Sequence, residues 1–96
     1  MPINRSQFIA TIRATKIRND DGKQMLIALA EMMNDDGLVR KALSSAERMA
    51  KRCGIGELTA RKYLLKLKGA NLIKIVKRKR LSWYQLANEE TISKLI

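Results

Sequence analysis

The sequence predicts a mainly helical fold with a small β-hairpin, in the order α-α-β-α-α-β-β-α. Residues 45–68 read as two short helices joined by a glycine turn, and residues 72–86 read as two strands separated by a basic tip. The chain has 96 residues. This length suits one domain of about 100–200 residues, so we expect a single domain over residues 1–96.

Two amphipathic helices are expected before this motif. The first lies in residues 1–19, where four apolar side chains recur at helical spacing: Phe8, Ile9, Ile12 and Ile17. The second spans residues 21–34 and has a broader apolar stripe that includes Met25, Leu26, Leu29 and Met33. Asp20 or Asp21 can cap its start, and Gly37 can end it.

The four residues Asn-Asp-Asp-Gly occur twice, at 19–22 and at 34–37. Carboxylates beside a glycine can form a calcium loop, but the full loop spacing and its terminal glutamate are missing here. We therefore expect two turns. The chain has one cysteine and no histidine, which argues against a structural zinc site, and no cofactor is expected.

The central segment is expected to hold a short strand and two helices. Residues 38–43 can form the strand, and Ser44 with Glu47 suggests a capping box for a helix that ends near Cys53 and Gly54. A second helix is expected over residues 57–68, ended by Gly69. Its expected inward positions are Leu58, Tyr63, Leu65 and Leu67, whereas Lys66 and Lys68 are expected to point outward.

The last third of the chain is expected to form a hairpin and a final helix. Strands are expected at 72–76 and 81–86, with Tyr84 and Leu86 facing the core. Trp83 should cover the sheet or pack against the final helix, although stacking on a base is an alternative. Asn88 can cap a helix over residues 88–96 with three apolar residues: Ile92, Leu95 and Ile96.

Positive charge is concentrated in the second half of the chain. The net charge is +11; residues 1–43 carry +2 and residues 44–96 carry +9. Nine basic residues and no acidic one lie between Arg61 and Arg80. This asymmetry indicates a polyanionic partner, with a merely solubilising surface as the alternative. No secretion signal is evident, and the longest apolar stretch is too short to span a bilayer, so we expect a cytoplasmic protein without membrane contact.

The glycine turn meets the steric needs of two helices that cross closely. A small residue, Ala50, stands where the helices approach, and Gly54 stands where the turn needs a positive φ. The apolar residues that would hold the helices together are Met49, Cys53, Ile55, Ala60 and Tyr63. We expect Cys53 to be a buried, inert thiol.

Over residues 21–88 this pattern resembles the winged helix-turn-helix family of DNA-binding proteins. The resemblance rests on 45–56, 59–64 with Leu67, 69–73 and 83–86, and it is greatest to small bacterial, archaeal, phage and plasmid regulators. Two features depart from the family. Gly56 stands where serine or threonine is more usual, and the wing turn contains no glycine.

The resemblance implies that the helix 57–68 enters the major groove. Its groove-facing residues would be Gly56, Glu57, Thr59, Arg61 and Lys62. Arg61 is the leading candidate to read a guanine and Thr59 is the second. Glu57 could accept a hydrogen bond from cytosine or could stabilise the helix dipole, and Lys62 and Lys66 are expected at phosphates.

Further contacts are expected from the wing, the first helix of the motif and the termini. The wing tip would reach phosphates or a narrow minor groove through Lys77, Arg78, Lys79 and Arg80. Arg48, Lys51 and Arg52 would add phosphate contacts. The two terminal helices are the expected dimer surface, through Phe8, Ile9, Ile12, Ile92 and Leu95.

The expected function is that of a homodimeric transcriptional regulator that binds specific duplex DNA. A protein that binds a plasmid or viral centromere or origin, for partition or replication, is the alternative with the same contacts. RNA or ribosome binding is a more remote alternative, because the chain has only four aromatic residues. No catalytic constellation is evident, so an enzyme is not expected, and the sequence identifies no partner protein.

Overall fold

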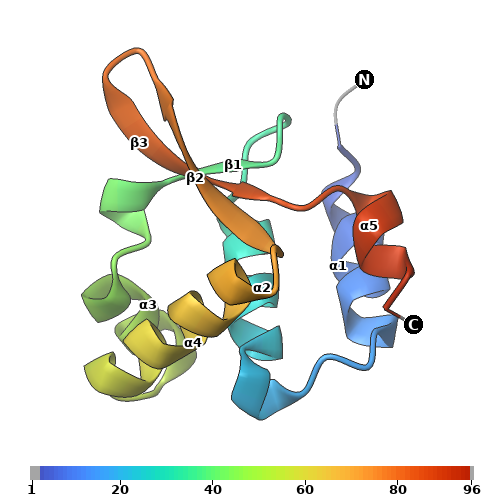
Figure 1. Cartoon of the computed structure of the whole chain (residues 1–96), viewed down its shortest axis with the longest axis horizontal. Coiled ribbons are helices and arrows are strands. Elements are labelled where there is room, and N and C mark those ends of the chain that lie inside the picture. The colour runs from blue at the N-terminus through green and yellow to red at the C-terminus, as the bar shows by residue number, and fades with distance from the viewer. Residues whose placement is uncertain (1–2, 96) are drawn as a thin grey trace.

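The computed structural model describes residues 3–95 and contains the predicted order of helices and strands (Figure 1). Two short 3₁₀ helices, η1 and η2, are added to that order. The elements are α1 (Arg5–Ala14), η1 (Asn19–Asp21), α2 (Lys23–Met32), β1 (Leu38–Arg40), η2 (Lys41–Leu43), α3 (Ala46–Cys53), α4 (Glu57–Gly69), β2 (Ile73–Arg78), β3 (Leu81–Leu86) and α5 (Glu89–Ser93). Met1, Pro2 and Ile96 lie outside the described residues, so the expected place of Ile96 on the final helix is not tested.

Helix α2 is the centre of the core. Its six residues from Met25 to Ala30 are all buried, as expected for a helix that is apolar on every side. α1 packs against α2 from the side of the termini, and α3 and α4 pack against it from the other side (Figure 1). This core also contains three methionines, Met25, Met33 and Met49, and Met32 is partly buried against it.

The terminal helices complete the core of a single chain. Phe8 is 1% exposed, and Ile12 and Ile92 are 0% exposed. The prediction that these three side chains form a dimer surface is therefore wrong, because α1, α2 and α5 enclose them. A hydrogen bond of 2.8 Å from Thr11 Oγ1 to Glu89 Oε1 also links α1 to α5. Of the residues expected at a dimer surface, Ile9 stays partly exposed and Leu95 exposed.

The sheet is antiparallel, with the strand order β1-β3-β2. Tyr84 on β3 pairs with Val39 on one side and with Ile75 on the other. Tyr84 and Leu86 are buried, which confirms the predicted core face of this strand. The strand expected over 38–43 is shorter than predicted, because the chain turns into η2 after Arg40.

Helix α3 begins one residue later than the expected capping box implies. Ser45 is its N-cap, and the Ser45 Oγ accepts a hydrogen bond of 3.3 Å from the Arg48 backbone N–H. Ser44 is instead buried, and its hydroxyl donates to the Arg40 carbonyl over 2.9 Å. The predicted pairing of Ser44 with Glu47 is wrong because Ser44 is the C-cap of η2, and Ser45 takes the N-cap position of α3.

The N-terminal end of α2 fixes the position of α4. Gly22 has a φ of +98°, and a Cβ at this position would lie 3.2 Å from the Leu67 Cγ. Beside this contact, the Lys66 Nζ lies 3.0 Å from the Asp21 Oδ1 and 3.2 Å from the Asp20 carbonyl oxygen. Glycine at position 22 therefore permits both the backbone conformation and the close approach of α4.

No helix within residues 3–95 has the length and apolar character needed to cross a membrane.

Candidate nucleic-acid interface

Helices α3 and α4 meet through the small residues that the sequence predicted. Ala50 and Ala60 are buried at this crossing, as is Met49. Gly54 follows α3 with a φ of +69°, and the Ile55 N–H donates to the Ala50 carbonyl over 3.0 Å. A Cβ at Gly54 would meet nothing within 4 Å, so this position needs glycine for its backbone conformation alone.

Helix α4 divides into a buried face and an exposed face. The buried residues are Ala60, Leu64 and Leu67, spaced by four and three as one side of a helix requires. Leu58 is 80% exposed and Leu65 is 61% exposed. The prediction that these two leucines point inward is wrong, because they lie on the opposite face from the buried set.

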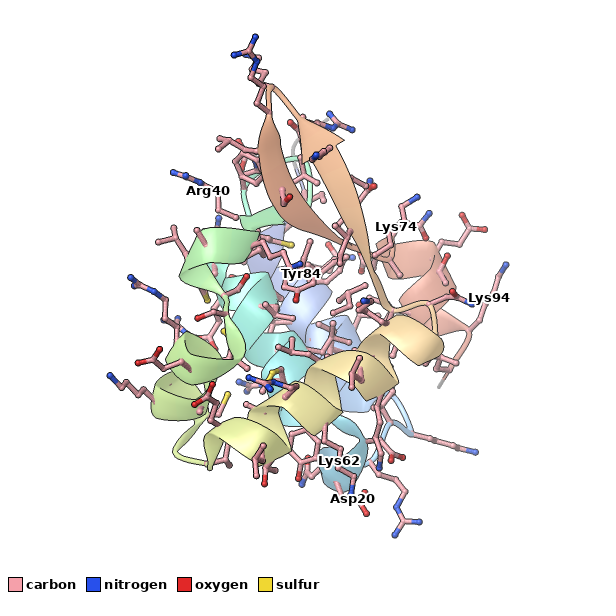
Figure 2. The ribbon with its side chains drawn as sticks, turned by 60° about the vertical axis from the view of Figure 1, so that its left-hand side comes forward. Asp20, Arg40, Lys62, Lys74, Tyr84 and Lys94 are labelled. Atoms are coloured by element: carbon pink, nitrogen blue, oxygen red, sulfur yellow. The ribbon has the colours of Figure 1, made fainter. Side chains whose placement is uncertain are left out.

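The exposed face of α4 holds the predicted groove-facing residues. Glu57, Thr59, Arg61 and Lys62 are all exposed, and Gly56 caps the helix without a side-chain hydrogen bond. Figure 2 shows Lys62 on the outer side of α4. The Arg61 Nη2 lies 3.2 Å from the Glu57 Oε1, and both side chains are more than half exposed. Arg61 is thus positioned by a neighbour one turn away and remains open to a partner.

Lys66 also has an acidic neighbour. Its ammonium group is engaged by Asp21 and by the Asp20 carbonyl, as described above. Both side chains of the pair are exposed, so the ammonium group can exchange the carboxylate for a phosphate. The phosphate contact expected of Lys66 therefore stays a prediction.

The wing tip carries four exposed cations. Lys77 and Arg78 are the last residues of β2, and Lys79 and Arg80 form the turn with φ values of 52° and 67°. All four side chains are exposed, because the hairpin extends beyond the helices (Figure 1). The loop predicted over 77–80 is thus reduced to two residues. Strand alternation here buries no charge, since both faces of the hairpin tip meet solvent.

A hollow of about 290 Å³ lies between α4 and the hairpin. Three basic side chains line it, Lys41, Arg61 and Lys68, together with the exposed apolar residues Leu65 and Ile75. Tyr84 also lines it, and burial raises the pKa of its hydroxyl above the ordinary value, so the ring stays uncharged. The hollow therefore forms a basic surface that is continuous from α4 to β2.

The basic residues of α3 line a separate hollow. Arg48, Lys51 and Arg52 are exposed around a shallow depression of about 600 Å³, which shares no lining residue with the hollow at α4. Lys51 also lies 3.9 Å from Glu47 Oε1, one turn earlier on α3. An exposed ion pair of this kind contributes little stability, so the ammonium group can exchange it for a phosphate.

Cys53, the last residue of α3, is only partly buried, although a buried thiol was expected. Burial still raises the pKa of the thiol above its ordinary value, so a reactive thiolate is disfavoured. Within residues 3–95 no three side chains of histidine, cysteine, aspartate or glutamate gather in a way that could hold a metal. Trp83 lies on the sheet face opposite Tyr84, and its indole N–H is buried without a hydrogen-bond partner in the described part of the chain.

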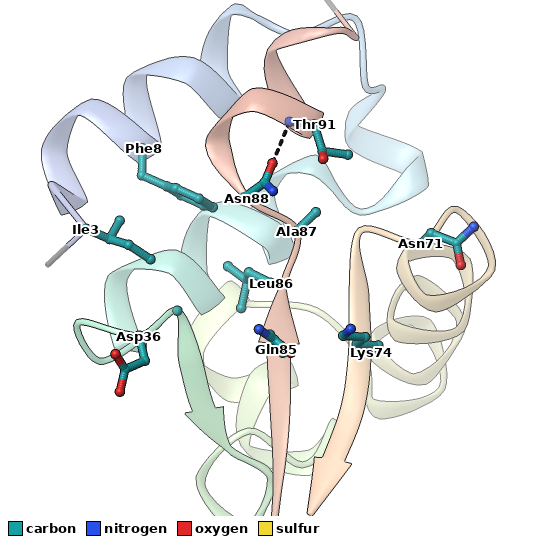
Figure 3. A pocket seen from close by; sticks show the side chains of 11 residues that line it. Ile3, Phe8, Asp36, Asn71, Lys74, Gln85, Leu86, Ala87, Asn88 and Thr91 are labelled. Carbon is teal, nitrogen blue, oxygen red and sulfur yellow. Dashed lines mark hydrogen bonds between the residues drawn. The ribbon is translucent and has the colours of Figure 1, made fainter. Parts of the chain in front are cut away.

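A third cavity, of about 390 Å³, lies at the other end of β3, next to α1 and α5 (Figure 3). Phe8, Leu86 and Ala87 line its apolar part, and Lys74 and Gln85 line its polar part. The Asn88 Oδ1 accepts a hydrogen bond of 2.7 Å from the Thr91 N–H and so caps α5 beside it. This cavity shares no lining residue with the hollow at α4.

A comparison with solved structures identifies the same architecture. The chain is similar to a winged helix-turn-helix domain from Mycobacterium bovis, which is named as homodimeric and DNA-binding and as part of a possible ArsR-family transcriptional regulator. The two are 20% identical, the TM-score is 0.50, and the match covers 96% of this chain and 72% of the other. No protein-family model and no curated protein sequence matches the chain. The fold is therefore that of a winged helix-turn-helix.

Proposed function

We propose that the chain binds duplex DNA, with α4 in the major groove and the wing on the flanking backbone. The observation that carries this proposal is the juxtaposition of Arg61 and Lys62, exposed on α4, with a projecting hairpin that holds four cations. An α-helix fits the major groove of B-form DNA. The nine basic residues without an acidic one between Arg61 and Arg80 supply the attraction to phosphate.

Different residues of this surface have different roles. Arg61 can donate two hydrogen bonds to the acceptors of a guanine edge, whereas Lys62 and the cations of the wing and of α3 neutralise phosphates. Thr59 is two positions from Arg61, which is roughly 200° around a helix. The two side chains therefore face different base pairs, and Thr59 contacts the edge of the site opposite the wing.

Glu57 holds Arg61 in the unbound protein. A carboxylate so close to the DNA backbone would weaken non-specific binding. Glu57 therefore favours sites where a guanine replaces its carboxylate as the hydrogen-bond partner of Arg61. Its position in the first turn of α4 also suits the positive end of the helix dipole.

The proposed biological role is that of a dimeric transcriptional regulator. Two copies would present their α4 helices about 34 Å apart, which is one turn of the duplex. The homodimer reported for the Mycobacterium bovis domain supports this arrangement. Ile9 and Leu95 remain candidates for the dimer contact, because both stay accessible in the single chain.

Selection of bound sites from random duplexes tests the DNA-binding proposal, with a structured RNA of equal charge as competitor. We expect enrichment of a short sequence with a guanine in each half-site and weaker binding to the RNA. Preference for the RNA would overturn the proposal. A footprint on the selected site then separates the two biological roles, because one short palindrome indicates a regulator, whereas spreading along an array indicates DNA partition.

A further inference from the structure

Two leucines on the exposed face of α4 have no role in the fold. Leu58 and Leu65 are the most exposed large apolar side chains in residues 3–95. Helix propensity does not require them, since lysine, arginine and glutamine support a helix about as well as leucine. Single exposed leucines are common on protein surfaces. This pair is different because both lie on one face of one basic helix.

The spacing of the two leucines suits a DNA groove. They are seven residues apart, or about 10.5 Å along the helix axis. Three base steps of about 3.4 Å cover nearly the same distance. Lys62 lies between them on the same face, and Arg61 lies beside them at the hollow that leads to the wing.

The electrostatics of this face disfavour a second copy as its partner. Arg61 and Lys62 lie beside the leucines, and only Arg61 has an acidic neighbour, Glu57, so two such faces would repel each other if they met. A duplex supplies the complementary charge. It also supplies one apolar group on its major-groove edges, which is the C5-methyl group of thymine.

We propose that Leu58 contacts a thymine methyl group in the major groove, and that Leu65 lies against a second one about three base steps away. The inference rests on the proposed DNA binding and adds a specificity determinant to it. The contact removes apolar surface of both partners from water, which is favourable in proportion to the area covered. Arg61, three residues after Leu58, then reads a guanine next to that thymine.

The test uses the selected duplex and replaces each thymine in turn by deoxyuridine, which pairs identically but lacks the methyl group. We expect two positions, about three base steps apart, at which uracil weakens binding of the unmodified protein about fourfold each, as the loss of one buried methyl group implies. At one of these two positions, the Leu58→Ala variant should bind the thymine and uracil duplexes equally well. Its fold should persist, because Leu58 makes no core contact, and circular dichroism checks this.

Leu43→Ala is the matched control, since Leu43 is an exposed leucine on η2, outside α4 and the proposed dimer contact. This variant should keep the full ratio between thymine and uracil duplexes. The inference is overturned if uracil is neutral at every position or if Leu58→Ala keeps the same ratio. It is also overturned if Leu58→Ala dissociates a dimer in sedimentation experiments, since the leucine would then contact a second copy. Binding without a uracil effect refutes this inference alone, whereas absence of any duplex binding refutes the proposed function as well.

Discussion

The Arg61 Nη2 on α4 lies 3.2 Å from the Oε1 of Glu57, the first residue of the same helix, and both side chains are more than half exposed. Arg61 also lines the basic hollow between α4 and the hairpin. An exposed pair at this spacing contributes at most about 0.5 kcal/mol to stability. The pair therefore positions the guanidinium at little energetic expense when DNA displaces the carboxylate.

Arg61→Ala should abolish the preference for the selected site and leave weaker non-specific binding. The expected loss is about 1–3 kcal/mol on the selected site, because a bidentate contact to guanine is removed. Fluorescence anisotropy on the selected and a scrambled duplex measures this difference. An equal loss on both duplexes would contradict a base-reading role, and Lys62→Ala, which removes a phosphate contact, serves as the matched control.

Replacement of Lys77, Arg78, Lys79 and Arg80 by glutamine should flatten the salt dependence of binding. The log–log slope should change by roughly 0.9 for each phosphate contact that is lost. A control variant replaces four exposed cations outside the proposed interface: Arg13, Lys16, Arg18 and Lys94. Equal slopes for the two variants would mean that the wing tip stays in solvent.

The two cations in the wing turn should lower the stability of the fold while they strengthen DNA binding. Lys79 and Arg80 both have positive φ, a conformation that suits a two-residue hairpin turn but favours Asn-Gly. The double substitution Lys79→Asn, Arg80→Gly should raise the free energy of unfolding by about 1–2 kcal/mol and weaken DNA binding. Urea denaturation measures the first effect, and an unchanged midpoint would show that the turn is not strained.

Gly22→Ala should destabilise the chain by more than about 1 kcal/mol. The new Cβ meets a φ of +98° and the Leu67 side chain at 3.2 Å, so α4 must shift or the turn must strain. Gly69→Ala is the matched control, since a Cβ there meets nothing within 4 Å and alanine favours a helix. Thermal unfolding that ranks the two variants in the opposite order would contradict the packing described for α2 and α4.

Phe8→Ala should lower the free energy of unfolding by about 3–5 kcal/mol, because the side chain is enclosed by its own chain. The loss should not depend on protein concentration. Ile9→Ala, with a partly exposed side chain on the same helix, is the comparison. If the loss of unfolding free energy in Phe8→Ala depended on protein concentration, Phe8 would belong to a dimer interface after all.

The sequence predicted the parts of the fold that local sterics decide. Ala50 and Gly54 identify the helix crossing and the turn, and the alternation around Tyr84 identifies the core face of β3. The burial of Phe8 and Ile92 within the single chain was not predictable. An apolar stripe has the same sequence pattern whether its own chain or a second copy covers it.

The candidate site was predicted less completely than the fold. The predicted inward positions of Leu58 and Leu65 are wrong, because the spacing of Ala60, Leu64 and Leu67 places the core on the other side of α4. That spacing is the signal that could have found them. The engagement of Lys66 by Asp21 joins residues that are 45 positions apart, so no local pattern reports it.

The most direct test of the central claim is an NMR titration of the isotope-labelled chain with the selected duplex. The account predicts that chemical-shift changes concentrate at the backbone amides of residues 57–65 and 77–80. Residues of α1 and α5, which lie on the other side of α2, should change little. Changes confined to α1, α5 and the cavity beside Asn88 would contradict the placement of α4 in the major groove.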